Sequence, residues 1–227
     1  MNHPESSPSP RAFRSGLRRP IVAMVTDSRL YREAAEDVAA AAVRAARAGV
    51  DLVQIRERTL DGAALLELSA RVRDATRTTS ARILINERVD VALAAGADGV
   101  HLPAGAPGTE RIRAIVPDGF LIGRSVHSEQ EAVAVEAAGG CDYLVFGTVY
   151  ETRSKPVGHP VAGPEALARV CRSVRLPVLA IGGITVARVP DVVAAGAAGI
   201  AAIGLFAVAG QTELEETVAK IRHAFEA

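Results

Sequence analysis

The 227-residue sequence has few aromatic residues, little cysteine and no net charge. Tryptophan is absent and aromatic residues make up 4% of the chain, whereas hydrophobic residues make up 49%. A core must therefore be built from small and branched aliphatic side chains. Basic and acidic residues number 26 each. This balance gives no electrostatic basis for binding nucleic acid or an anionic membrane surface.

Further absences exclude other classes of protein. Cys141 and Cys171 lack the spacing of a metal site, and two reduced thiols are typical of a cytoplasmic protein. No apolar run reaches about 18 residues, so no membrane span is expected. Residues 1–19 are rich in proline, serine and arginine, which predicts a disordered tail rather than a secretory signal. Residues 20–227 are expected to form one domain.

Short apolar runs alternate with longer alanine-rich segments after this tail, and the alternation favours a parallel sheet covered by helices. The expected strands are Ile21–Val25, Asp51–Arg56, Arg82–Asn86, Gly99–Leu102, Phe120–Gly123, Tyr143–Phe146, Val178–Ile181 and Gly199–Ile203. Eight strand-helix units predict an α/β fold of the closed (β/α)8 type, a TIM barrel.

An internal repeat supports the count of eight strands. The phrase Ala48-Gly49-Val50-Asp51 recurs in related form at 95–98, 139–142 and 195–198. In each copy the glycine suits the left-handed end of a helix, and a strand follows. Four copies, each two strand-helix units apart, imply eight strands. The last interval is longer because of residues 148–163, which are either an active-site lid or a surface excursion.

Polar residues gather at the ends of two early strands. Gln54, Arg56 and Arg58 alternate along the second strand and beyond it, so they share one face. They predict an anion site at the barrel mouth, with a salt-bridged surface edge as the alternative. Asn86 ends the third strand, where it either caps the next helix or contacts a ligand. Together with Glu87 it could form half of a magnesium site.

The last two strands each end in glycine. Gly182 and Gly183 follow the seventh strand, and Gly204 follows the eighth. The last two loops of such barrels often bind phosphate through backbone amides, so these glycines predict a phosphate site. Tight turns without a ligand are the alternative.

Two histidines lie at predicted strand ends. Ser128 and Glu131 fit a capping box, which places His127 at the start of a helix on the face where barrel enzymes hold their catalytic groups. A hydrogen-bonded structural histidine is the alternative for His127. His101 ends the fourth strand and is expected to have a packed, structural role.

Taken together, these residues resemble the thiamine phosphate synthase superfamily over almost the whole chain from Pro20 onward. The matching segments are Gln54–Arg58, Ile85–Asp90, Gly96–Leu102, Lys155 after a Thr/Ser-bearing loop, and Ala180–Ile184. The resemblance implies a (β/α)8 barrel, a phosphate site at the glycine loops, and a cytoplasmic homodimer that helps to assemble thiamin from small-molecule substrates.

This superfamily has two activities. A thiamine phosphate synthase joins a pyrimidine diphosphate to a thiazole phosphate with Mg2+, whereas a thiazole tautomerase aromatises a carboxythiazole phosphate by a cofactor-free proton shift. The synthase pattern has lysine in place of Arg58, aspartate in place of Glu87, and a second metal-binding aspartate in place of Ala106. These departures favour the tautomerase, whose pattern resembles Gly123–Ser128 of this sequence.

For a tautomerase, the resemblance implies that His127 carries the proton and that no metal or cofactor is needed. The substrate carboxylate would meet Arg56, Arg58 or Lys155, and further substrate contacts are expected from Gln54, Asn86 and Ser125. Under the synthase alternative, Mg2+ would be required. A third possibility is a non-catalytic protein that binds thiamin intermediates.

Overall fold

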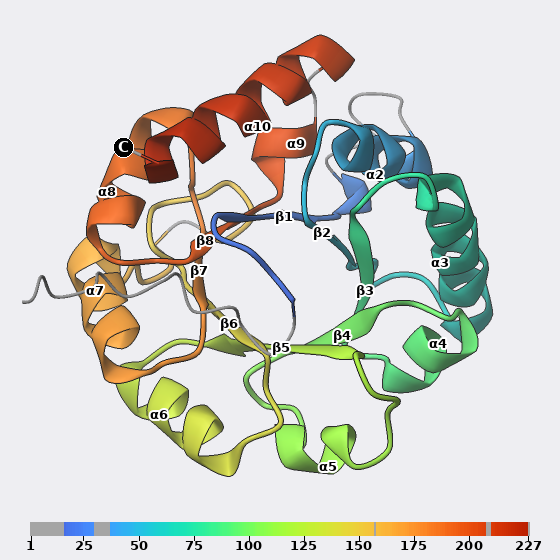
Figure 1. The fold of residues 1–227 in the computed structure, drawn as a ribbon, viewed down its shortest axis with the longest axis horizontal. Coiled ribbons are helices and arrows are strands. Elements are labelled where there is room, and N and C mark those ends of the chain that lie inside the picture. The colour runs from blue at the N-terminus through green and yellow to red at the C-terminus, as the bar shows by residue number, and fades with distance from the viewer. Residues whose placement is uncertain (1–15, 30–36, 157, 208–209, 227) are drawn as a thin grey trace, which may run out of the picture.

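The computed structural model describes residues 16–29, 37–156, 158–207 and 210–226. Within them, eight parallel strands form a closed barrel in sequence order, and β1 (Ile21–Val25) completes the ring by pairing with β8 (Gly199–Ala202). Helices surround the strands, as Figure 1 shows. The predicted (β/α)8 barrel is confirmed. Residues 1–15 of the predicted tail lie outside the described residues.

Strands alternate with helices along the chain, and β7 and β8 are each followed by two helical elements. The other strands are β2 (Leu52–Ile55), β3 (Arg82–Asn86), β4 (Gly99–Leu102), β5 (Leu121–Val126), β6 (Tyr143–Phe146) and β7 (Val178–Ile181). The helices of the described residues are α2 (Val38–Arg47), α3 (Gly62–Thr76), α4 (Val89–Ala94), α5 (Thr109–Arg113), α6 (Glu129–Ala138), α7 (Gly163–Ser173), the 3-10 helix η1 (Val186–Arg188), α8 (Val189–Ala194), α9 (Gly204–Ala207) and α10 (Gln211–Glu226).

The fifth strand is longer than the sequence predicts. It was expected to end at Gly123, but the ladder with β6 continues through Ser125 and Val126. In the sequence, Arg124 and Ser125 have the polarity of a turn. In the strand, each of these side chains finds hydrogen-bond partners on its own side of the sheet. The predicted second and eighth strands are slightly too long at their ends.

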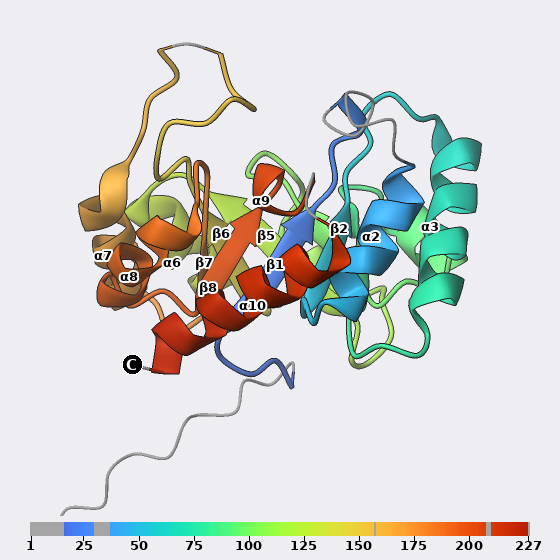
Figure 2. The same ribbon diagram turned by 90° about the horizontal axis from the view of Figure 1, so that it is seen from above.

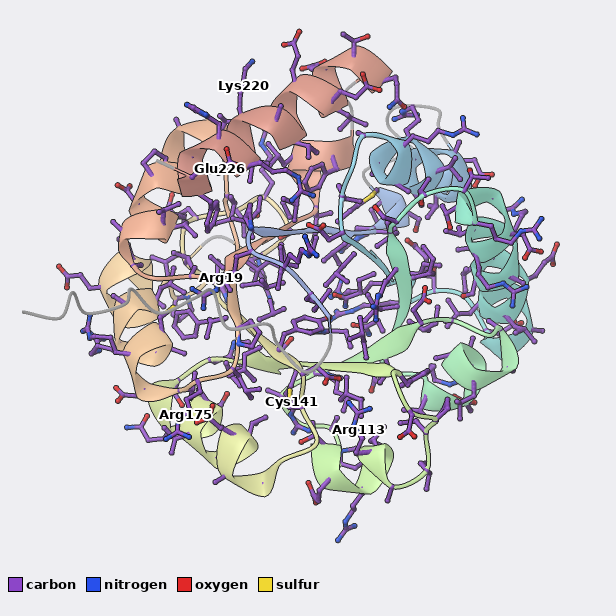
Figure 3. All side chains as sticks on the ribbon, in the orientation of Figure 1. Arg19, Arg113, Cys141, Arg175, Lys220 and Glu226 are labelled. Carbon is purple, nitrogen blue, oxygen red and sulfur yellow. The ribbon has the colours of Figure 1, made fainter. Side chains whose placement is uncertain are left out.

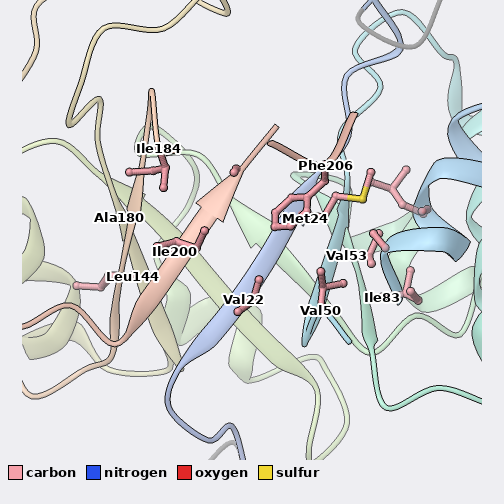
Figure 4. Packing of buried hydrophobic residues seen from close by; sticks show 14 of the residues in the cluster. Val22, Met24, Val50, Val53, Ile83, Leu144, Ala180, Ile184, Ile200 and Phe206 are labelled. Carbon is pink, nitrogen blue, oxygen red and sulfur yellow. The ribbon is translucent and has the colours of Figure 1, made fainter. Parts of the chain in front are cut away.

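Alternate residues of each strand face the barrel interior or the helices. The interior is filled by large apolar side chains that include Leu52, Leu84, Leu121, Tyr143 and Leu179. The outward-facing residues form a second apolar layer beneath the helices, and Figure 4 shows part of this layer around Val22, Met24, Val53 and Ile200. Helix α2 contributes mainly buried alanines, so it can lie close to the strands. The low aromatic content of the chain is thus consistent with close packing.

The internal repeat fixes the amino end of the barrel. In three copies, the aspartate accepts a hydrogen bond from a backbone N–H of the preceding strand: Val22 to Asp51 at 2.7 Å, Ile83 to Asp98 at 2.7 Å, and Ile122 to Asp142 at 2.8 Å. The fourth copy has Ala198, which has no such acceptor. The four repeat glycines have positive φ angles, as expected. The repeat is therefore structural and leaves the carboxyl end of the barrel to the functional residues.

The amino end of the barrel is closed and the periphery is charged. Leu17 is 7% exposed and packs with the interior cluster, so packing begins before Pro20. Figure 3 places labelled charged residues such as Lys220 and Arg175 on the outside of the ring. Among the described residues, none of the helices has the length and apolarity that crossing a membrane requires.

Candidate active site

Four polar side chains cover the apolar interior at the carboxyl ends of β2 to β5. Gln54 and Asn86 follow interior leucines of their strands by two residues, and Gln54 Nε2 donates a hydrogen bond to Asn86 Oδ1 at 2.8 Å. His101 Nε2 and Ser125 Oγ lie 2.8 Å apart. Gln54 and His101 are buried, and Asn86 and Ser125 are half-buried. The structure therefore brings Gln54, Asn86 and Ser125 together at one mouth, the end at which TIM barrels carry their active sites.

The guanidinium of Arg56 lies beside these polar side chains, and the carboxylates of Asp27 and Glu57 act on it electrostatically without forming a direct ion pair. Burial, and next the neighbouring charge of Arg58, lower the pKa of Arg56. Neither arginine side chain forms an ion pair or hydrogen bond with another described residue. Arg56 is half-buried and Arg58 is exposed. Two adjacent guanidiniums whose N–H groups are not engaged by a described carboxylate favour the binding of an anion.

The backbone around Arg56 is held by a buried carboxylate. Arg56 N–H donates to Thr26 Oγ1 at 2.9 Å, and the Thr26 hydroxyl donates to Glu57 Oε1 at 2.6 Å. Glu57 Oε2 accepts the N–H of Ser28 at 3.0 Å. Glu57 is 7% exposed. It ties the end of β1 to the end of β2 and so fixes the backbone from which Arg56 projects.

The glycine turns lie on the neighbouring part of the same rim. Gly182 and Gly183 follow β7, have positive φ angles, and pack against the start of the 148–163 segment. Neither glycine N–H donates to another described residue outside the strand ladders. Gly204 follows β8 and begins α9. Because β7 pairs with β8, these turns are neighbours, and their amides are available to an anion.

The 148–163 segment rises above this rim, as Figure 2 shows between β6 and α7. Its two ends pair with each other through the Ala162 N–H and the Thr148 carbonyl at 2.8 Å. Tyr150 N–H donates to the Gly182 carbonyl at 3.0 Å, and the Arg188 guanidinium lies over the Tyr150 ring at 4.6 Å. Lys155 is exposed near the middle of the segment. The segment is therefore anchored to the glycine turn at its base, whereas Lys155 projects from its outer part.

His127 lies apart from the other predicted residues. The capping box is present, since Glu131 N–H donates to Ser128 Oγ at 3.1 Å and His127 N–H donates to Glu131 Oε2 at 2.7 Å. The imidazole is exposed, and its Nδ1 is 2.7 Å from the Gly147 carbonyl oxygen. His127 lines a cleft of 270 Å³ formed with Phe146, whose side chain faces the outer apolar layer, and with α7. It thus faces the space between α6 and α7 rather than the barrel axis.

Sequence reasoning missed Tyr143 and Arg124, which shape the mouth together with His101. His101 is buried and hydrogen-bonded, as in its expected packed structural role, and one of its partners is Ser125. Tyr143 supports His101 from below. Arg124 is 8% exposed and donates hydrogen bonds to carbonyl oxygens of the β4–α5 loop, at Ala104, Ala106 and Pro107. The available signal was periodicity, because His101 and Tyr143 share the inward phase of their strands while Arg124 has the outward phase.

Comparison with known proteins then assigns the family. Residues 22–206 match the family described as thiamine monophosphate synthase. The chain belongs to this family. A thiamine-phosphate synthase from Methanoculleus marisnigri is 44% identical over 178 residues, which span 78% of this chain and 83% of that protein.

A second family member is similarly close, and a solved structure supports the fold of the family. A putative thiamine-phosphate synthase from Geobacter sulfurreducens is 43% identical over 181 residues, spanning 79% of this chain and 83% of that protein. The structure of a thiamine phosphate pyrophosphorylase from Pyrococcus furiosus has a TM-score of 0.77 at 32% identity and covers 91% of this chain and 95% of that one.

These comparisons contradict the expectation of a thiazole tautomerase, which is wrong. Relatives that are 43–44% identical carry the synthase name. The error came from the weight given to Ala106, because a magnesium ion often uses one protein carboxylate and several phosphate oxygens of the substrate. The role of His127 as proton carrier depended on the tautomerase reaction and is not carried forward.

The synthases of the family are expected to use Mg2+, but the described residues do not fit a magnesium ion held by the protein itself. No group of three acidic, histidine or cysteine side chains suited to a metal occurs among them. Glu87 is exposed at the end of β3. Ala106 offers no side-chain ligand, its methyl packs on the outer apolar layer, and its carbonyl accepts a hydrogen bond from Arg124 at 2.9 Å. The β4–α5 loop is thus organised around an arginine.

Proposed function

We propose that this protein is a thiamine-phosphate synthase, which joins a hydroxymethylpyrimidine diphosphate to a thiazole phosphate and releases diphosphate. Family membership and the names of the relatives support this reaction. The observation that supports the proposal is that two separate groups suited to anions lie on one rim. Arg56 and Arg58 supply guanidiniums at β2, and the glycine turns supply backbone amides at β7 and β8.

The two sites suit the two substrates. One substrate carries a diphosphate with a high negative charge, which the paired guanidiniums match. The other carries a monophosphate, to which the N–H groups of Gly182, Gly183 and Gly204 can donate hydrogen bonds, since they have no backbone acceptor among the described residues outside the strands and helices. The Gln54 and Asn86 amides and the Ser125 hydroxyl lie on the β2–β5 arc of the same mouth and offer hydrogen bonds to the pyrimidine substrate.

The reaction moves one electron pair at each end of a single carbon. The bond between the pyrimidine methylene carbon and the diphosphate oxygen breaks, and the diphosphate leaves with the electron pair. The thiazole nitrogen gives its lone pair to the same carbon and forms the new C–N bond. Negative charge grows on the leaving diphosphate, so fixed guanidiniums beside it stabilise the transition state more than the ground state.

Mixing the purified protein with both substrates in magnesium buffer tests this proposal. We expect thiamine phosphate and diphosphate to form in equal amounts, and no diphosphate to appear when the thiazole phosphate is left out. Absence of turnover would contradict the proposal. Thermal stabilisation by the substrates without turnover would instead favour the non-catalytic binder.

A further inference from the structure

A chain of three polar side chains runs from the barrel interior to the mouth. Tyr143 Oη lies 3.3 Å from His101 Nδ1, and His101 Nε2 lies 2.8 Å from Ser125 Oγ. Tyr143 and His101 are 2% and 3% exposed, whereas Ser125 is half-buried. Ser125 is therefore the member of the chain that a substrate can reach.

The position of Tyr143 is fixed by the strand beside it. The phenol ring lies against Gly123 of β5, and a β-carbon at that position would overlap the ring and its hydroxyl. Gly123 and Tyr143 are paired in the barrel ladder. A residue with a side chain at position 123 would displace the phenol, so this glycine helps to hold the hydroxyl against the imidazole.

The proton of His101 can be assigned by counting donors and acceptors. Burial lowers the pKa of His101 to about 3, and the charges of Arg56 and Arg124 act in the same direction. The imidazole is therefore neutral at pH 7 and carries one proton. If the proton were on Nδ1, it would point at the Tyr143 oxygen, and the phenol proton would have no acceptor among the described residues.

The opposite arrangement satisfies every buried group. The Tyr143 hydroxyl donates to Nδ1, and the Nε2–H donates to Ser125 Oγ. Because buried polar groups in proteins are nearly always hydrogen-bonded, this arrangement is preferred. The Ser125 oxygen then accepts a hydrogen bond from inside the barrel, and its own proton is free to point into the mouth.

We infer that His101 is a positioning residue that orients the Ser125 hydroxyl as a hydrogen-bond donor toward an anionic oxygen of the substrate. Arg56 follows the end of β2 and Ser125 lies near the end of β5, both at the carboxyl-end mouth, and the guanidinium of Arg56 acts electrostatically on His101, so one anion can be held by both Arg56 and Ser125. The identity of this anion as the substrate diphosphate rests on the proposed function. The direction of the hydrogen bonds does not.

Nitrogen NMR of protein labelled with 15N-histidine tests the direction of the hydrogen bonds. The chain has five histidines, and the signals of His101 are those that disappear in His101→Gln. We expect a protonated Nε2 and a bare Nδ1 at pH 7, because the two kinds of nitrogen resonate far apart in a neutral ring. A proton on Nδ1, or on both nitrogens, would overturn the inference whether or not the protein turns over its substrates.

Calorimetric binding of inorganic diphosphate tests the link from His101 to Ser125. Ser125→Ala should weaken binding about tenfold, the effect of one hydrogen bond to an anion. His101→Asn should weaken it equally, because the shorter amide ends near the Nδ1 position. His101→Gln carries an N–H near the Nε2 position and should stay within about threefold of the wild type.

The double variant Ser125→Ala/His101→Asn tests whether His101 acts through the Ser125 hydroxyl or stabilises the site as a whole. It should bind diphosphate no more weakly than Ser125→Ala alone, since His101 acts through that hydroxyl. Additive losses, or wild-type binding by His101→Asn, would overturn the inference. If His101→Asn does not fold, Tyr143→Phe replaces it, because loss of the phenol lets the proton move to Nδ1. Binding by Tyr143→Phe that equals that of the wild type would then count against the inference.

The two proposals fail in different ways. A protein that shows the expected tautomer and binding cycle but does not turn over the two substrates refutes the proposed synthase and leaves the role of His101 intact. A protein that releases diphosphate but shows additive losses refutes the role of His101 alone.

Discussion

The two arcs of the barrel mouth are built from different groups. From β2 to β5 the mouth is lined by side chains that are buried or half-buried and hydrogen-bonded in pairs, with Arg56 beside them. From β7 to β8 it is lined by glycine turns whose backbone amides are the polar groups. Side chains can be graded in charge and length by mutation. Backbone donors can only be displaced, by adding a side chain where there is no room for one.

The largest effect is expected in the arc from β2 to β5, which we call the side-chain arc. Replacing Arg56 with Gln removes the half-buried guanidinium and should lower kcat/KM by about 100-fold or more, near 3 kcal/mol of transition-state stabilisation. The kcat/KM of Arg56→Lys should lie between those of the wild type and Arg56→Gln, because an ammonium keeps the positive charge but lacks the fork of guanidinium donors. Steady-state rates of diphosphate release measure both effects.

Arg58→Gln is the matched control for this prediction. Arg58 is exposed, so solvent screens its charge, and a loss of about tenfold is expected. If the loss at Arg58 equals or exceeds the loss at Arg56, burial does not set the strength of this arc.

The arc from β7 to β8, which we call the backbone arc, should lose stability when a side chain is added to one of its glycines. Gly183 has a φ of 62°, and a β-carbon there would collide with the backbone of Glu151. Gly183→Ala should cost about 3 kcal/mol of folding stability, from left-handed backbone strain and overpacking together. It should also raise KM for the thiazole phosphate. Thermal unfolding and steady-state kinetics measure the two effects.

Gly204→Ala is the control on the neighbouring strand. A β-carbon at Gly204 meets nothing within 4 Å, so little change in melting temperature is expected. Equal destabilisation by the two alanines would mean that contact with the 148–163 segment does not explain why position 183 is glycine.

The repeat, the alternation of apolar runs and the glycine positions predicted the barrel and both arcs, because these features depend on local periodicity and on backbone geometry. The phosphate role of Gly182, Gly183 and Gly204 stays a prediction, as do the roles of Gln54, Asn86, Ser125 and Lys155. Except for Lys155, which lies on the 148–163 segment, their positions at the rim follow from the strand ends. Their chemistry depends on ligands that a strand pattern does not specify.

Other features depend on contacts between residues that are distant in the sequence, so they could not be predicted from it. Tyr143 is 42 residues from His101, and their contact exists only when β4, β5 and β6 are adjacent. The burial of Arg124 against three loop carbonyls has the same origin. The choice between synthase and tautomerase failed for another reason. It was drawn from single departures such as Ala106, whereas similarity along most of the chain favours the synthase.

The titration of His101 should make the folding stability of the protein depend on pH. The pKa of His101 is about 3 in the folded protein, below the usual value of 6.5, and its charged neighbours there are Arg56 and Arg124. Between these pH values the unfolded chain binds a proton that the folded chain does not. The stabilisation that comes from the neutral His101 is fully present above pH 6.5. It is lost as pH falls below that value, by about 1.4 kcal/mol of folding free energy per pH unit.

Denaturant unfolding from pH 7 to pH 4 measures this loss, and His101→Gln is the control. Carboxylates titrate in the same range in both proteins, so the difference between them isolates the imidazole. The variant should have the flatter curve. Parallel curves would mean that His101 is protonated in the fold, which is incompatible with its hydrogen bonds to Tyr143 and Ser125.

The smallest effect is expected where the backbone arc is held by a side chain. The Arg188 guanidinium donates to the Gly183 carbonyl at 2.6 Å and lies over the Tyr150 ring, so it fastens the 148–163 segment to the glycine turn. Arg188→Met keeps much of the apolar stem and removes both contacts, at a cost of about 1 kcal/mol. The segment should then be cut faster by protease, and KM for the thiazole phosphate should rise a few-fold while kcat changes little.

Tyr150→Phe is the matched control, because the Tyr150 hydroxyl is enclosed without a hydrogen-bond partner among the described residues. Removing that hydroxyl should leave protease resistance unchanged or higher, since an unsatisfied buried group is lost while the ring beneath Arg188 stays. Equal loosening by both variants would show that the Tyr150 hydroxyl matters as much as the guanidinium and would contradict the role given to Arg188.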